Sequence, residues 1–258
     1  MSRELILANL HLYAVLPRLQ ELVKLDPDAR KLAGEMKSAI RFAVRGGPSV
    51  LLKFSGGAVS VTRDRREGCD IGLYFTSPQK LNKMFLGQSV VPIPYLGSPG
   101  GLTRLGDLKR FTKLTEIMTR YLKPSAHDMN DPEFRARHVE MGLMVGIAGA
   151  GVIGESDPMM ARTVKKLRDG TLLVNVKPVG PKAHVVVKGG RITALNGPID
   201  TPSGTIEIKD LDTAVALLAN KLDTFAAVGA CDLRIFGLIP LADEFSALMD
   251  RVGLYLNA

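Results

Sequence analysis

Cysteine and histidine are scarce in this sequence, which has 2 cysteines and 4 histidines among 258 residues. Cys69 and Cys231 do not have the spacing of a disulfide framework or a zinc site, which favours a reducing compartment such as the cytoplasm. A metal or hydrolytic centre would need convergent ligands or a positioned base. No such spacing relates the histidines, which are His11, His127, His138 and His184. The sequence therefore predicts a protein that is not an enzyme and has no metal and no cofactor.

Long apolar runs are also missing. The apolar segment at residues 5–16 has only 12 residues and includes Asn9 and His11. A membrane-spanning helix needs about 20 apolar residues. A similar segment returns in mid-chain at residues 141–154, so we expect both to be structural helices and not signal sequences.

Aromatic residues make up 5% of the chain and the basic residues are scattered, which argues against a nucleic-acid-binding protein. The charge is nevertheless uneven. Residues 1–123 contain 20 Lys and Arg against 10 Asp and Glu, a charge of +10, whereas residues 124–258 have a charge of −2. The first half either faces an anionic partner, such as a membrane surface, an acidic protein or a phosphate-bearing ligand, or has a solvated basic face. The run at residues 63–66 is the best local candidate for contact with anionic lipid headgroups.

The sequence does contain an internal repetition with a period near 130 residues. Residues 53–60 return as residues 186–193, each segment with a Gly-Gly pair, and Phe111, Leu114 and Tyr121 recur as Phe245, Leu248 and Tyr255. Such a period is a domain length and far exceeds the repeat of a solenoid. We therefore interpret the chain as a tandem duplication, with copy one at residues 1–123 and copy two at residues 124–258.

Local signals predict the same elements in each copy. An apolar helix (residues 5–24 or 133–153) is followed by an Asp-Pro step, at Asp26 or Asp157, that caps a second helix. Three antiparallel strands come next, two of them joined by the glycine pair, and then a strand, a short helix, a last strand and a terminal helix. The predicted class is α+β, with two similar domains. Each has a small, mainly antiparallel five-stranded sheet covered on one face by helices.

Residues 149–154 match the G-x-G-x-x-G pattern of dinucleotide-binding proteins. That motif requires a preceding strand and a following phosphate-binding helix. Here the residues before Gly149 have a helical pattern, and Asp157-Pro158 follows Gly154 too closely for a new helix. We therefore expect residues 145–154 to be helical, with small residues that let the helix lie close to a neighbour or leave space for a ligand.

A surplus of apolar side chains in the same part of each copy is the remaining candidate site. In copy two these residues are Leu217, Leu218, Leu222, Phe225, Val228, Phe245, Leu248, Met249 and Val252. In copy one they are Met84, Phe85, Val91, Phe111 and Met118. Helices over a small sheet can form a solid core or leave a pocket for an apolar ligand, and periodicity alone does not decide between the two.

These segments also carry a family resemblance. Copy two resembles the sterol carrier protein (lipid-transfer) domain family in four segments, which are residues 203–210, the helix that follows to Leu218, residues 225–229 and residues 233–238. Residues 69–87 resemble the same strand-helix unit in copy one, but Pro92, Pro94 and a glycine-rich loop replace the segment that follows. The resemblance implies a five-stranded sheet covered by helices and a tunnel for fatty acyl chains, sterols or similar molecules.

The expected function is a non-enzymatic binding or carrier protein for an apolar ligand, such as a fatty acyl, sterol-like or isoprenoid lipid. Copy two is expected to have the better pocket, because prolines fix φ and remove backbone donors in copy one. The alternative is an accessory interaction module whose apolar helices dock on a partner enzyme or on the chain's own duplicate.

Overall fold

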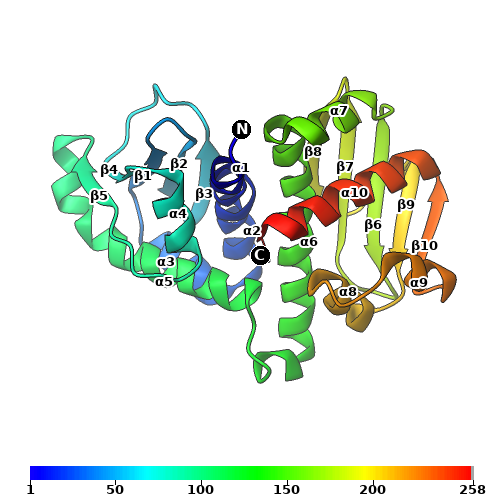
Figure 1. Cartoon of the computed structure of the whole chain (residues 1–258). Coiled ribbons are helices and arrows are strands. Elements are labelled where there is room, and N and C mark those ends of the chain that lie inside the picture. The colour runs from blue at the N-terminus through cyan, green and yellow to red at the C-terminus, as the bar shows by residue number, and fades with distance from the viewer. Residues whose placement is uncertain (257–258) are drawn as a thin grey trace. The chain divides into compact units, whose positions relative to one another are not determined.

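The computed structural model describes residues 1–256, and residues 257–258, the end of the predicted second domain, lie outside the described residues. The chain divides into two compact units, Met1–Arg120 and Tyr121–Ala258, each with a five-stranded sheet and helices (Figure 1). The division falls inside helix α5 (Leu105–Leu122), whereas the sequence predicts a boundary after residue 123. The class of each unit is α+β.

The first unit begins with a helical segment that changes its hydrogen bonding near a proline. The α-helix α1 (Arg3–Leu10) continues as a π-helical turn, η1 (His11–Val15), and a 3₁₀ turn, η2 (Leu16–Arg18). It becomes α-helical again in α2 (Leu19–Leu25). Because Pro17 has no N–H, the regular ladder of the α-helix is interrupted there. The predicted helix at residues 5–24 is thus present, with a break around the proline.

The rest of the first unit follows the predicted order of elements. After α2 come α3 (Pro27–Gly34), β1 (Ala39–Val44), β2 (Ser49–Ser55), β3 (Ala58–Thr62), β4 (Ile71–Phe75), α4 (Pro78–Phe85), β5 (Ile93–Leu96), η3 (Pro99–Arg104) and α5. Asp26 caps α3 as predicted, because its carboxylate accepts a 2.9 Å hydrogen bond from the N–H of Ala29. The proline-containing segment of copy one ends in the edge strand β5.

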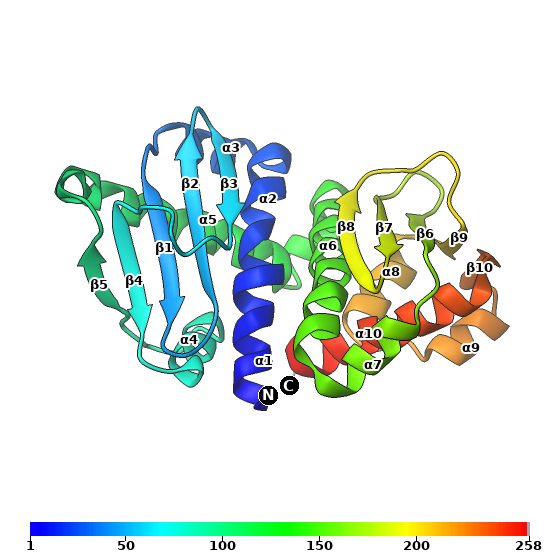
Figure 2. The ribbon, with the colours of Figure 1, turned by 90° about the horizontal axis from the view of Figure 1, so that it is seen from above.

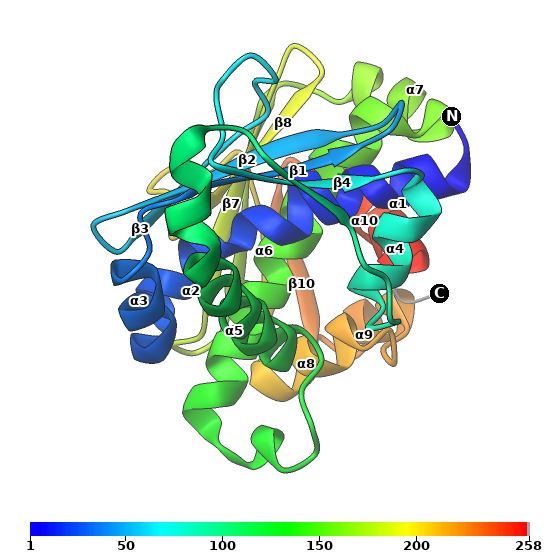
Figure 3. The same ribbon diagram turned by 90° about the vertical axis from the view of Figure 1, so that its left-hand side faces the viewer.

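An aromatic cluster forms the core between the first sheet and α5. The ring of Phe42 on β1 lies 6.3 Å from that of Phe75 and 5.6 Å from that of Phe111 on α5. Phe54 on β2 contacts the same Phe111 ring at 6.2 Å. The sheet lies in front of α5 in Figure 2 and is seen nearly edge-on in Figure 3, with α3, α4 and α5 on one side. Alternate residues of β1, Arg41 and Ala43, therefore face the opposite side.

The second unit repeats this order from a different sequence. Its elements are η4 (Asp128–Asn130), α6 (Pro132–Ser156), α7 (Pro158–Lys166), β6 (Gly170–Val176), β7 (Lys182–Lys188), β8 (Arg191–Asn196), β9 (Gly204–Ile208), α8 (Leu211–Leu218), α9 (Thr224–Gly229), β10 (Leu233–Gly237) and α10 (Ile239–Leu256). The helix α9 has no counterpart in the first unit, where the chain passes from α4 to β5.

Both sheets are mixed, so the prediction of mainly antiparallel sheets is wrong. The strand orders are β3-β2-β1-β4-β5 and β10-β9-β6-β7-β8, and the pairs β1/β4 and β6/β9 are parallel. The physical reason is the return path of the chain after each hairpin. Residues 63–70 carry the chain back past the sheet to start β4 beside the start of β1. Asp70 holds this start, because its carboxylate accepts a 2.8 Å hydrogen bond from the N–H of Ala39.

The G-x-G-x-x-G segment lies inside α6, which confirms that residues 145–154 are helical. Its glycines allow close packing, because a Cβ added at Gly154 would lie 2.6 Å from Cγ2 of Val164 on α7. One added at Gly151 would lie 3.0 Å from the carbonyl oxygen of Ile192 on β8. The segment is therefore a packing surface and has no phosphate-binding loop.

By length and composition, α6 is also apolar enough to cross a membrane. However, 61% of its most apolar 18-residue window is buried inside the protein, so most of this window packs in the core.

Hydrogen bonds of Asp157 link the junction between α6 and α7 to the C-terminal helix α10. Its carboxylate caps α7 through the N–H of Met159 at 2.9 Å. It also accepts hydrogen bonds from Nε of Arg251 at 3.0 Å and from the hydroxyl of Tyr255 at 3.1 Å. Burial by itself would raise the pKa of Asp157, but the bonds from Met159, Arg251 and Tyr255 outweigh burial and hold the pKa below its usual value.

We expect Asp157→Asn to lower the free energy of unfolding at pH 7 by about 1–3 kcal/mol, because the charge-assisted bonds from Arg251 and Tyr255 are weakened. The folded-state pKa is depressed, so this stabilisation is present above the ordinary carboxyl pKa and is lost as the pH falls through the lower folded value. Urea unfolding of the wild type and the variant should therefore differ at pH 7 and converge in strong acid. Asp131→Asn, at the exposed N-cap of α6, is the matched control and should be nearly neutral. A difference that stays constant down to pH 2 would contradict this account.

Candidate functional site

The predicted ligand-binding residues of the second unit fall into three groups by exposure. The first group is buried in the core along one face of α10, with spacings of three and four residues, and consists of Phe245, Leu248 and Val252. This spacing places the three side chains on one side of the helix. Part of the predicted set therefore forms the packed core.

The second group is half-buried, and two of its members lie against glycines of α6. It consists of Leu217, Leu218, Leu222 and Met249. A Cβ added at Gly142 would lie 2.6 Å from Cδ1 of Leu218, and one added at Gly146 would lie 2.6 Å from Cε of Met249. Leu218 and Met249 therefore occupy the space that these two glycines leave on α6. Both side chains are flexible, and methionine in particular adapts to irregular spaces.

The third group is exposed on and around α9. Phe225 is 88% exposed, and Val228 lies one turn further along the same helix and is exposed as well. Two other large apolar side chains are exposed on the adjoining elements, Phe236 on β10 and Ile239 at the start of α10. We call these four residues, Phe225, Val228, Phe236 and Ile239, the apolar rim. Exposed apolar side chains that gather into one patch commonly mark a ligand-binding or interaction site.

The corresponding residues of the first unit are more dispersed. Phe111 and Met118 are buried on α5, whereas Met84 and Phe85 on α4 are half-buried. The ring of Phe85 stacks on His11 at 4.4 Å, and Val91 is 84% exposed in the segment before β5. The structure thus brings Phe111 into the aromatic core and leaves Val91 apart from it.

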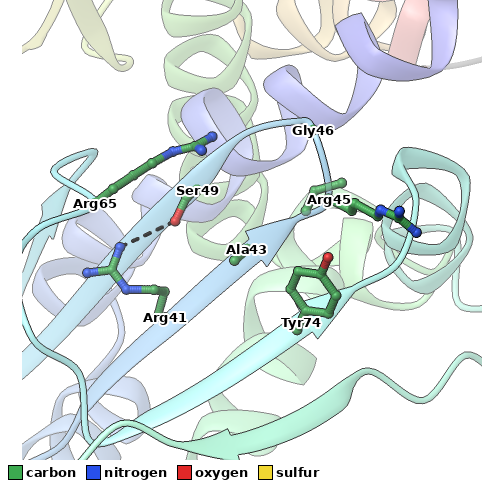
Figure 4. Close-up of a pocket in the computed structure, with 8 residues that line it drawn as sticks. Arg41, Ala43, Arg45, Gly46, Ser49, Arg65 and Tyr74 are labelled. Carbon is green, nitrogen blue, oxygen red and sulfur yellow. Dashed lines mark hydrogen bonds between the residues drawn. The ribbon is translucent and has the colours of Figure 1, made fainter.

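A cavity of about 330 Å³ lies on the face of the first sheet that is turned away from α5 (Figure 4). Its lining residues are Arg41, Ala43, Val44, Arg45, Gly46, Ser49, Arg65 and Tyr74. We call this cavity the arginine groove. Of its lining residues, only Arg65 belongs to a feature predicted from the sequence, the basic run at residues 63–66. One signal was present: Arg41 interrupts the otherwise apolar strand segment at residues 40–44.

Three of the histidines have structural partners. Nδ1 of His11 lies 3.1 Å from Oδ1 of Asn82, and Nδ1 of His138 lies 2.6 Å from the carbonyl oxygen of Tyr121. Nδ1 of His184 lies 2.9 Å from the carbonyl oxygen of Gly197. Within residues 1–256, no group of three or more His, Cys, Asp and Glu side chains is placed to hold a metal ion.

No family model matches the sequence, and no curated protein matches it. Among solved structures, one similar chain is titled UbiJ-SCP2 ubiquinone synthesis protein, with 17% identity and a TM-score of 0.33. The match covers 43% of this chain and 96% of that one. Sterol carrier protein domain 2 of Helicoverpa armigera is 20% identical over 43% of this chain and 88% of that one, with a TM-score of 0.35.

Two further solved structures match parts of this chain, and the second of them is an alkylsulfatase. Palmitated SCP2L2 from Aedes aegypti is 19% identical over 44% of this chain and 93% of that one, with a TM-score of 0.33. The sec-alkylsulfatase Pisa1 from Pseudomonas sp. is 16% identical, with a TM-score of 0.28. That match covers 55% of this chain but only 27% of the sulfatase. The solved structures named here are thus mainly sterol carrier protein 2 domains, and at these identities and TM-scores they carry no argument about function.

Proposed function

We propose that this chain is a non-enzymatic carrier or binding protein for an apolar ligand, which it holds in the second unit, and that it acts in the cytoplasm. The observation that carries the proposal is the apolar rim, above all the exposed ring of Phe225. A large aromatic side chain left in water is unfavourable unless something covers it in use. A fatty acyl, sterol-like or isoprenoid lipid has the apolar surface to do so.

Half-buried side chains of the same unit offer a route inward. Leu218 and Leu222 are half-buried, and Leu218 and Met249 occupy the spaces at Gly142 and Gly146. A change of rotamer at Leu218 or Met249 would open space without moving the backbone. An alkyl chain that enters there loses contact with water, at about 0.8 kcal/mol for each buried methylene. Ten methylenes would contribute about 8 kcal/mol before the entropic cost of binding.

The alternative function is an accessory interaction module. The same apolar rim would then dock on a partner enzyme, and Leu218 and Met249 would stay in place as core. Titration of the full chain with a fluorescent fatty acid distinguishes the two proposals. A carrier should bind the probe saturably at about one molecule per chain, whereas an interaction module should show no saturable binding.

Membrane association is expected to come from the first half, which has a charge of +10. Each Lys or Arg near an anionic bilayer contributes about 1 kcal/mol, and this attraction is screened by salt. In flotation assays we expect stronger binding to vesicles that contain phosphatidylserine than to neutral vesicles, with the difference lost at 1 M salt. Equal binding to neutral vesicles would refute this expectation.

A further inference from the structure

The arginine groove combines three cationic side chains with no acidic residue in its lining. Within residues 1–256, no ion pair joins Arg41, Arg45 or Arg65 to a carboxylate. The carboxylates of the neighbouring loop are engaged elsewhere, because Glu67 pairs with Lys53 and Asp64 accepts a hydrogen bond from the N–H of Arg66. The groove is thus a site of uncompensated positive charge.

Arg41 is the most constrained of the three, with only 7% of its surface exposed. Its guanidinium donates to Oγ of Ser49 and to the carbonyl oxygen of Asp64, both at 3.3 Å, and to the carbonyl oxygen of Glu67. These bonds fix the orientation of the guanidinium and hold the loop at residues 63–70, but they do not neutralise its charge. A buried cation without a counter-charge is unfavourable, so a bound anion would stabilise it.

Three separate segments bring the groove together. Arg41 and Ala43 come from β1, Arg45 and Gly46 lie at the turn into β2, and Arg65 comes from the crossing loop. In Figure 4, Arg41 and Arg65 lie on either side of Ser49, and Tyr74 lies on the other side of Ala43 beside Arg45. Arg65 donates to the carbonyl oxygen of Gly47, which holds the loop near the turn. The small side chain of Ala43 leaves the centre open.

We propose that the arginine groove binds a phosphate monoester. Guanidinium groups form charge-assisted, paired hydrogen bonds with phosphate oxygens, and a phosphate monoester has enough oxygens and negative charge to engage more than one arginine. The hydroxyls of Ser49 and Tyr74 add neutral donors. At about 330 Å³ the groove is larger than a phosphate alone, so a glycerol-sized remainder fits beside it. The inference concerns a polar ligand in the first unit and is independent of the apolar ligand proposed for the second.

The test is isothermal titration of the full chain with glycerol 3-phosphate at low salt. We expect saturable binding that weakens about tenfold in Arg45→Gln and in Arg65→Gln, and further in the double variant. Both side chains are exposed, so the variants should fold. The double variant Lys109→Gln/Lys113→Gln removes the same charge from the exposed surface of α5, on the other side of the sheet, and should bind like the wild type. An equal loss in this control, or no saturable binding in the wild type, would overturn the proposal.

A second arm separates the two sources of the phosphate. If the ligand is a lipid headgroup, vesicles that contain phosphatidic acid should bind more strongly than vesicles with the same charge supplied by phosphatidylserine. The Arg45→Gln/Arg65→Gln variant should lose this preference. If the ligand is a soluble phosphate ester, glycerol 3-phosphate should bind while the two kinds of vesicle bind equally. Binding of a fluorescent fatty acid should be unchanged in Arg45→Gln/Arg65→Gln. The phosphate proposal for the first unit and the apolar-ligand proposal for the second unit can therefore fail independently of each other.

Discussion

Phe245→Ala is expected to lower the free energy of unfolding of the second unit by about 3–5 kcal/mol. Phe245 is 1% exposed and lies on the buried face of α10 with Leu248 and Val252. Removal of its ring loses the buried apolar area and leaves a cavity that the packed core does not fill. Urea unfolding followed by circular dichroism measures the loss.

Phe225→Ala is the matched control, because it removes the same ring from the same unit. Phe225 is 88% exposed, so its loss should change the free energy of unfolding by no more than about 0.5 kcal/mol. Equal destabilisation by the two variants would mean that Phe225 packs into the core, and the apolar rim would then not exist as described.

Phe225→Asp has the largest expected effect on binding. We expect it to weaken binding of a fluorescent fatty acid about ten- to a hundredfold, because the apolar contact is lost and a charge is placed where the alkyl chain must shed water. The fold should survive, because the new carboxylate is solvated on an exposed helix. Leu218→Asp should also weaken binding, but it places a charge in a half-buried position and should cost stability as well.

Two controls accompany this variant. Val179→Asp changes an apolar residue that is 92% exposed in the same unit but lies outside the apolar rim, and it should leave binding intact. Phe85→Asp makes the parallel change in the first unit and should matter less than Phe225→Asp. If Phe85→Asp abolishes binding while Phe225→Asp leaves it intact, the ligand is held in the first unit. If both variants fold and neither changes binding, the interaction module becomes the better account.

Local chemistry was enough to predict most of the elements in this fold. The Asp-Pro steps cap α3 and α7 because a carboxylate can accept the free N–H groups of the first turn, whatever lies around it. The glycine pairs turn the hairpins because Gly56 and Gly57 adopt φ values of 57° and 81°, which other residues seldom do. Gly189 and Gly190 do the same in the second unit, at 57° and 71°.

The arrangement of the strands was harder to predict. The period of two in β1 and β4 reports which residues share a face, but it says nothing about which strand lies beside which. The parallel pairing depends on the loop at residues 63–70, which has no periodic pattern and is held through Arg41 and Asp70. The mixed sheet followed from these tertiary contacts.

The candidate sites were likewise only partly predictable from the sequence. Helical spacing places Phe245, Leu248 and Val252 on one face, but spacing does not report which apolar side chains remain uncovered. Phe225 belongs to a six-residue helix, too short for a face to be inferred from its sequence. The arginine groove was missed because Arg41, Arg45 and Arg65 come together only through the strand register and the crossing loop.

Native mass spectrometry of the full chain, purified without added lipid, tests the central claim most directly. The carrier account predicts a population whose mass exceeds that of the polypeptide by one lipid molecule, with the added mass released by organic extraction and restored by incubation with a fatty acid. This population should be depleted in Phe225→Asp and retained in Val179→Asp. A wild-type chain that shows only the polypeptide mass, both as purified and after incubation with fatty acids, would contradict the account.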